Sequence, residues 1–229
     1  TAGSFTASVR IEPGDSFRVR YDVEDPPSPF DALETNFYLP GNVRFAVRGE
    51  RTSVVADTRL DGELHLNGSF GEIGRGLRRA VERPRRRSRR KTQPIAPEDV
   101  REALMKTNWP EDAVVQLDDG WELRPRIRGE ATPVRLAIQE QGLRVHRVVV
   151  TCCDEEARLP VAFQALCFNA QLRHARLAWN GGAVVAETCL HDGLIDPAWL
   201  VPAARAVATA LHHTRTTLEI LARQAEVAR

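Results

Sequence analysis

A heptapeptide that occurs twice constrains the fold of this chain more than any other feature. Residues 54–60 read Val-Val-Ala-Asp-Thr-Arg-Leu and residues 184–190 read Val-Val-Ala-Glu-Thr-Cys-Leu, so five of the seven positions are identical. In both copies Val, Ala, Thr and Leu occupy alternate positions, which is the two-residue period of a strand with one apolar face. The pattern predicts two equivalent half-buried strands, each with its apolar face against a helix or a second sheet.

The repetition extends to the N-terminal side of the heptapeptide. Residues 29–47 parallel residues 160–179, and each segment reads as a short helix that carries an asparagine, Asn36 or Asn169, and leads into a strand. We therefore expect an α+β fold of two repeated modules, each an antiparallel sheet covered by helices. The expected boundaries are 1–82 for the first module, 83–97 for a basic linker, and 98–229 for a second module with its own leading helix and a long C-terminal helix.

Period-two alternation, turn residues and capping signals place the individual elements. The expected strands are 5–12, 16–23, 43–48, 53–60, 113–117, 121–128, 133–139, 143–151, 174–179 and 183–190. The expected helices are 30–38, 69–81, 97–107, 159–172 and a last helix from 197, which Pro202 is expected to kink.

The last helix carries the most regular apolar pattern in the chain. Its seam advances by alternate steps of four and three residues, through Leu200, Ala204, Val207, Leu211, Thr214, Leu218, Leu221 and Ala225. Such a narrow seam is typical of packing against one helix or a sheet. At 1.5 Å per residue the helix would run about 45 Å, long enough to reach the other module or a second chain.

Several features of the second copy occur together in one known family. A helix ends with Asn169 and Leu172, a strand of small and apolar residues follows, and a Gly turn leads to the acid-bearing strand that ends at Leu190. Residues 193–196 then lead into the last helix. This arrangement resembles the YbjN family and the type III secretion chaperone-like (CesT-like) fold. The resemblance implies an α+β module that forms dimers and holds protein segments. Because two copies lie in one chain, we expect an intrachain pseudo-dimer, and either a monomer or a homodimer as the assembly.

Composition excludes several classes of protein. The apolar fraction of 42%, the charged fraction of 28% and the net charge of +1 are those of a soluble globular protein without a global field for nucleic acid or membrane. No window is long and apolar enough for a membrane-spanning helix. The four cysteines, Cys152, Cys153, Cys167 and Cys189, lack the paired spacing of a zinc site. We expect four reduced, mostly buried thiols and a cytoplasmic protein.

One local charge cluster departs from this balance. Residues 83–91 contain seven cations in nine residues and offer nothing apolar to a core. We expect a solvated linker. The alternatives are binding of a nucleic acid, an acidic protein or an anionic membrane surface through Arg85, Arg86, Arg87, Arg89, Arg90 and Lys91. Seven phosphate contacts would give a salt dependence with a log–log slope of about −6, but no aromatic residue is interleaved to stack on bases.

Side chains with catalytic or ligating potential do not form a pattern that indicates a reaction. His212 and His213 are adjacent on a helix and diverge by about 100°, which is unsuited to one metal. The acidic pairs 118–119 and 155–156 lie at an expected turn and a helix start, where acids are common. We therefore expect no enzyme activity, no catalytic residue, no cofactor and no metal.

Two tryptophans and the end of the last helix are the best candidates for contact with a partner. Exposed Trp121 and Trp199 would be aromatic anchors for a peptide, with core packing as the alternative. Leu218 and Leu221 lie on the distal part of the last helix. The sequence favours a non-enzymatic protein-binding module, chaperone-like or regulatory, that accepts a partner segment on a sheet or helix surface. The alternative is a nucleic-acid-associated regulator that uses the basic run.

Overall fold

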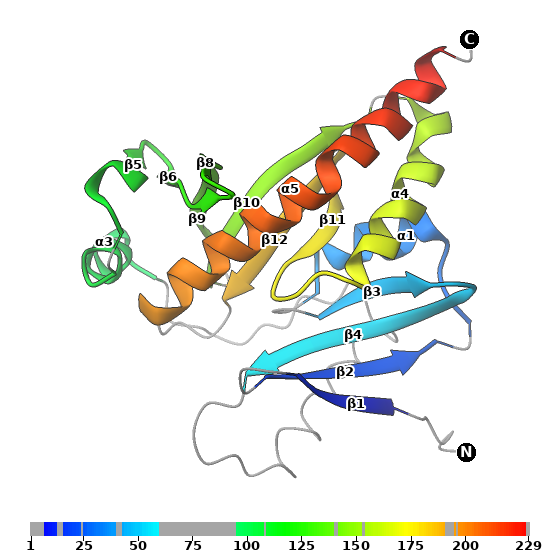
Figure 1. The fold of residues 1–229 in the computed structure, drawn as a ribbon, viewed down its shortest axis with the longest axis horizontal. Helices are drawn as coiled ribbons and strands as arrows, with labels where there is room; N and C mark the ends of the chain where they lie inside the picture. The colour runs from blue at the N-terminus through cyan, green and yellow to red at the C-terminus, as the bar shows by residue number, and fades with distance from the viewer. Residues whose placement is uncertain are drawn as a thin grey trace.

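Two antiparallel sheets with helices packed against them organise the chain, which is an α+β protein (Figure 1). The computed structural model describes residues 7–12, 16–23, 25–39, 43–59, 95–107, 109–139, 142–152, 154–190, 195 and 197–227. The predicted helix 69–81 and the basic run lie outside these residues. Within the described helices, none combines the length and apolar character needed to cross a bilayer.

The first sheet has four strands in the order β1-β2-β4-β3, and one helix connects β2 to β3 along the chain. Its elements are β1 (Ala7–Glu12), β2 (Ser16–Asp22), α1 (Pro29–Asn36), β3 (Val43–Arg48) and β4 (Arg51–Arg59). The helix begins where sequence chemistry favours it, because the Ser28 side chain accepts a hydrogen bond from the Asp31 amide and Pro29 occupies the first turn.

The second sheet has six strands in the order β11-β12-β10-β9-β6-β5. Its elements are α3 (Pro97–Met105), the short 3-10 turn η1 (Glu111–Ala113), β5 (Val114–Leu117), β6 (Gly120–Leu123), β9 (Val134–Gln139), β10 (Gly142–Thr151), α4 (Glu155–Asn169), β11 (Arg176–Asn180), β12 (Ala183–Leu190) and α5 (Pro197–Val227). The strand order β9-β10-β12-β11 within this sheet matches the order β1-β2-β4-β3 of the first sheet. Along the chain, α4 lies between β10 and β11, as α1 lies between β2 and β3.

Two predicted elements are wrong in their extent. The predicted strand 121–128 is divided, because Pro125 cannot donate to a ladder; the chain leaves β6 and forms a separate hairpin of β7 (Arg126–Ile127) and β8 (Glu130–Ala131). The predicted helix 159–172 begins four residues earlier, at Glu155, because the Asp154 side chain accepts the Glu156 amide as an N-cap. Pro160 lies inside that helix rather than at its start.

The heptapeptide strands differ from the prediction in two respects. The two-residue turns give a common reference point, because Arg48 pairs with Arg51 across one turn and Asn180 pairs with Ala183 across the other. The first heptapeptide begins at the fourth residue of β4, whereas the second begins at the second residue of β12. The two copies are therefore displaced by two residues. The prediction of a half-buried strand is also wrong, since all residues from Ala183 to Thr188 are buried on both faces of β12.

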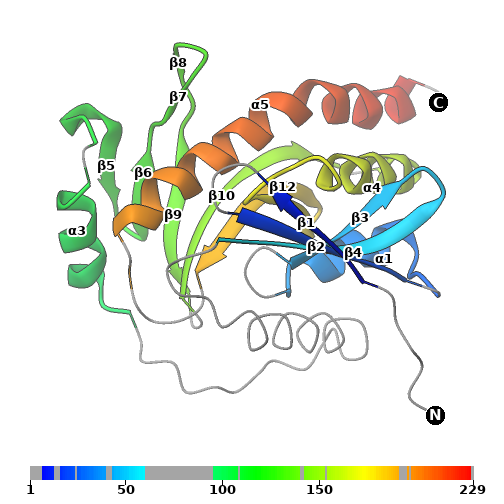
Figure 2. The same ribbon diagram turned by 60° about the horizontal axis from the view of Figure 1, so that its bottom comes forward.

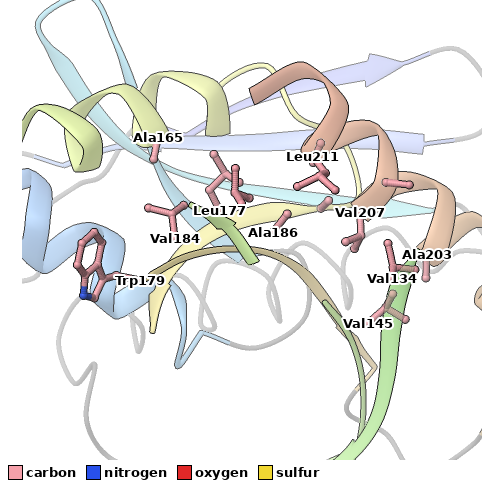
Figure 3. Packing of buried hydrophobic residues seen from close by; sticks show 14 of the residues in the cluster. Val134, Val145, Ala165, Leu177, Trp179, Val184, Ala186, Ala203, Val207 and Leu211 are labelled. Atoms are coloured by element: carbon pink, nitrogen blue, oxygen red, sulfur yellow. The ribbon is translucent and has the colours of Figure 1, made fainter. Parts of the chain in front are cut away.

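Helices α4 and α5 cover one face of the second sheet and enclose the core. Leu177 and Ala186 of the sheet lie near Val207 and Leu211 of α5 in Figure 3, and Ala165 of α4 lies above the same region. Helix α5 crosses the sheet from the end near α3 to the end near α4 (Figure 2) and continues through Pro202. The predicted seam is buried at Leu200, Ala204, Val207, Leu211, Thr214 and Leu218.

Candidate functional site

The two sheets meet at a junction formed by the edge strands β3 and β11 and the ends of α1 and α4. The Phe45 amide donates a hydrogen bond to Asn36 Oδ1 at 2.6 Å, and the Leu177 amide donates one to Asn169 Oδ1 at 2.7 Å. Each asparagine Nδ2 donates to both the Phe45 and the Leu177 carbonyls, at 3.0–3.3 Å. Both asparagines are fully buried. Two side-chain amides therefore take the place of a main-chain ladder between the sheets.

Arginines from one half satisfy the carbonyl groups at the end of the helix in the other half. Arg44 of β3 donates to the carbonyls of Asn169 and Leu172 at the end of α4. Arg176 of β11 donates to the carbonyl of Leu39 beyond the end of α1, at 2.7 Å. The last four carbonyls of a helix have no partner within it, and cations are favourable there. Neither α1 nor α4 has a basic residue in its own last turn.

Glu187 lies at the centre of a buried charge cluster next to this junction. Arg176 Nε donates to Glu187 Oε1 at 2.8 Å, and Arg144 donates to Glu187 Oε2. The guanidinium of Arg144 also lies 4.0 Å from the centre of the Phe37 ring of the first half. The relative exposures of the side chains of Arg144, Arg176 and Glu187 are 7%, 1% and 0%, so these charges are inaccessible to a substrate. Their geometry indicates that they hold the two halves together.

His146 lies beside this cluster, and its pKa is lowered in the folded state. Burial lowers its pKa from 6.5 to about 4, with Arg144 adding to the effect and Glu187 opposing it. The folded state therefore favours the neutral imidazole, whereas the unfolded chain takes up a proton below pH 6.5. We expect the free energy of unfolding to fall as the pH falls from 6.5 towards 4. Denaturant titrations across this range should show a shallower pH dependence for His146→Gln, and an unchanged slope would contradict the assignment.

Thiol and metal chemistry have little support among the described residues. Cys167 and Cys189 are free thiols, and Cys152 is buried. Burial raises the pKa of Cys189 to about 11 and raises that of Cys167 as well, which makes both thiols poor nucleophiles at neutral pH. In the part of the chain that the structure describes, no group of three His, Cys, Asp or Glu side chains could hold a metal ion.

The residues predicted to contact a partner do not come together. Trp121 is only 5% exposed, so the expectation of an exposed anchor is wrong for it; its strand β6 lies between β5 and β9, with Trp121 opposite Leu136. Leu218 is fully buried, and Trp199 and Leu221 are partly buried against the core. Trp199 and Leu218 are separated by about 28 Å along α5 at 1.5 Å per residue. The candidate polyanion-binding residues Arg85, Arg86, Arg87, Arg89, Arg90 and Lys91 lie outside the described part of the chain.

The feature most suited to a partner is the second part of β10, which the sequence did not single out. Residues 142–146 of β10 pair with β9, but no described strand pairs with residues 147–151 on that side. Continuing the register would place Pro133 opposite Val148, and proline has no amide hydrogen to extend the ladder. The other side of this segment pairs with β12, with a bulge at Val149. We call residues 147–151 the open edge.

The open edge combines main-chain groups that no described strand pairs on one side with an accessible apolar side chain. Val148 is 49% exposed, and Arg147 and Thr151 are also exposed. An edge strand presents unpaired amides and carbonyls to any extended chain that approaches it. The sequence Arg-Val-Val-Val-Thr also has the β-branched character that favours strand pairing. The signal available from sequence was Pro133, which precedes β9 and would lie opposite Val148 if the register continued.

Comparison with known proteins adds no family to these observations, since neither a protein-family model nor a curated protein matches the chain.

Proposed function

We propose that the protein is a non-enzymatic protein-binding module that accepts an extended partner segment at the open edge of β10. The observation that carries the proposal is the five-residue stretch of β10 that extends past its pairing with β9. A chain added there would gain main-chain hydrogen bonds, and its side chains at alternate positions would meet Val148 on one face of the sheet. A carboxylate in the partner would complement Arg147, for which no described residue provides an ion pair.

The open edge suits reversible binding rather than a permanent interface. A short segment of five residues supplies few hydrogen bonds, and a typical hydrogen bond contributes only about 1 kcal/mol net. The bulge at Val149 limits the length of regular ladder that a partner can form. Affinity would therefore depend on the exposed apolar contact at Val148 as well as on the main chain.

We also propose that the chain contains two type III secretion chaperone-like modules in tandem, clasped as an intrachain pseudo-dimer. The shared strand order and the matching contacts of Asn36 and Asn169 support this interpretation. In this arrangement the junction serves as scaffold. The open edge lies in the second sheet, which has the additional strands β6 and β5 beyond β9.

The substitution Val148→Lys should weaken binding at the open edge. Peptides selected from a random display library on the full chain provide the probe, and we expect at least about tenfold weaker binding by the variant, because lysine places a charge where an apolar contact forms. Hydrogen exchange should show protection of amides in residues 147–151 when peptide binds. Met105→Lys is the matched control, since Met105 is 77% exposed on α3.

A different outcome would favour nucleic acid as the partner. Peptide binding that is insensitive to Val148→Lys would contradict the open-edge proposal. Steeply salt-dependent binding of a DNA or RNA oligonucleotide, lost when the cations of residues 83–91 are replaced by serine, would support the regulator that uses the basic run.

A further inference from the structure

The junction between the halves has a reciprocal chemistry that suggests a second kind of interaction. Asn36 and Asn169 donate to the same two carbonyls, those of Phe45 and Leu177. The relation extends to the helices, because α1 packs on β11 of the second sheet and α4 packs on β3 of the first. Each half therefore presents to the other an edge strand, a helix end and an asparagine amide.

Neither half completes its own hydrogen bonding at this surface. The end of α4 receives donors from Arg44 and Arg18 of the first half, and the Leu39 carbonyl receives one from Arg176 of the second. Buried polar groups left without partners are costly, so each surface is chemically matched to the other. The apolar part of the contact includes the rings of Phe30 and Trp179, whose centres are 5.1 Å apart.

None of these described contacts requires the two halves to belong to one polypeptide. The hydrogen bonds between β3 and β11 pass through side chains, and the described strands form no continuous main-chain ladder between the two sheets. Thirty-five residues, 60–94, connect the last residue of β4 to Ile95 in the sequence. A connection of that length allows the partner of a half to come from a neighbouring molecule.

We propose that the junction surface of the second half is an association site for the first half of a second copy of this chain, so that two copies can exchange halves. The surface consists of the β11 edge, the end of α4 and the side chains of Asn169 and Arg176. The occupant supplies Arg44, Asn36 and α1 in the same positions as in the intrachain junction. This inference rests on the pseudo-dimer part of the proposed function and is independent of the open edge.

Cleavage of the full chain between its halves tests the inference. A protease site replaces residues 85–90, and the folded protein is cleaved and passed over a size-exclusion column. We expect the two fragments to elute together. When cleaved protein with a tag on its second half is mixed with untagged cleaved protein, the tagged half should capture untagged first half over time. Separation of the fragments on cleavage, or no capture after prolonged mixing or after unfolding and refolding of the mixture, would overturn the proposal.

A clasp variant separates association from folding. Asn36→Ala combined with Asn169→Ala should weaken fragment association at least about tenfold, whereas Gln171→Ala, an exposed position beyond α4, should not change it. The Arg176→Lys variant keeps the positive charge but loses the planar guanidinium with its several N–H donors, so it should weaken fragment association to an intermediate extent. Circular dichroism of each uncleaved variant tests whether it folds, and the single variants Asn36→Ala and Asn169→Ala carry the comparison if the double variant does not. Unchanged association of the double variant would contradict the assigned surface, and peptide binding at Val148 provides the separate readout for the proposed function.

Discussion

Replacement of Asn169 by Leu should lower the free energy of unfolding by about 3 kcal/mol. The substitution leaves the Leu177 amide without its acceptor in a fully buried site, and removes one of the two amide donors to the Phe45 and Leu177 carbonyls. A buried group left unpaired costs about 1–3 kcal/mol, and the packing of leucine in a site shaped for an amide adds to this. Urea titration followed by tryptophan fluorescence and circular dichroism should show a lower midpoint with an unchanged slope.

The paired asparagine makes this prediction more specific. Asn36→Leu should have a similar effect, because its bonds to Phe45 and Leu177 match those of Asn169. With both replaced, the two carbonyls lose every side-chain donor seen at the junction, so the double variant should lose about 1 kcal/mol more than the sum of the single effects. Gln171→Leu is the control and should change stability by less than about 0.5 kcal/mol. Additive effects would contradict a shared network.

The sequence predicted the elements of the junction but not its register. Sliding a strand by two residues keeps the same side chains on the same face, so the alternation in the heptapeptide cannot distinguish the two alignments. The hydrogen bonds decide between them, because Phe45 and Leu177 occupy matching positions and pair with Val54 and Ala186. The asparagines gave the better signal, since each lies at the end of a helix shortly before an arginine-bearing strand.

The buried charges could not be predicted from local pattern. Alternation places Glu187 on the face opposite Ala186, where a lone sheet would meet solvent. That face is covered by Phe37 and Leu39, residues far away in the sequence, whose position depends on the assembly of the two halves. The prediction for Trp121 is wrong for a related reason. Its strand β6 is an interior strand because it pairs with both β5 and β9, and its neighbour Gly120 approaches the Leu136 carbonyl so closely that a Cβ would lie 2.3 Å from the oxygen.

Replacement of Glu187 by Leu should have the largest effect on stability of any single substitution considered, about 4 kcal/mol. The carboxylate neutralises the charges of Arg176 and Arg144. Its loss leaves both guanidinium groups without this counter-charge in a buried site. Removal of one partner from a buried ion pair costs about 3–5 kcal/mol, because the remaining charge stays desolvated. Thermal and urea unfolding should both report the loss, with little dependence on salt, since buried pairs are screened less than exposed ones.

The order of three variants tests whether burial of the charges causes this effect. Arg144→Met should cost less than Glu187→Leu, about 2 kcal/mol. It leaves Glu187 paired with Arg176, and it removes an Nε that has no hydrogen-bond partner among the described residues. Glu102→Gln, which breaks an exposed pair with Lys106 on α3, should change stability far less than either substitution, and that small loss should shrink in high salt. If Arg144→Met proved as damaging as Glu187→Leu, the stability would depend on the packing of the arginine on Phe37 rather than on neutralisation by Glu187. An effect of Glu187→Leu as small as that of the exposed pair would mean that the cluster does not hold the two halves together.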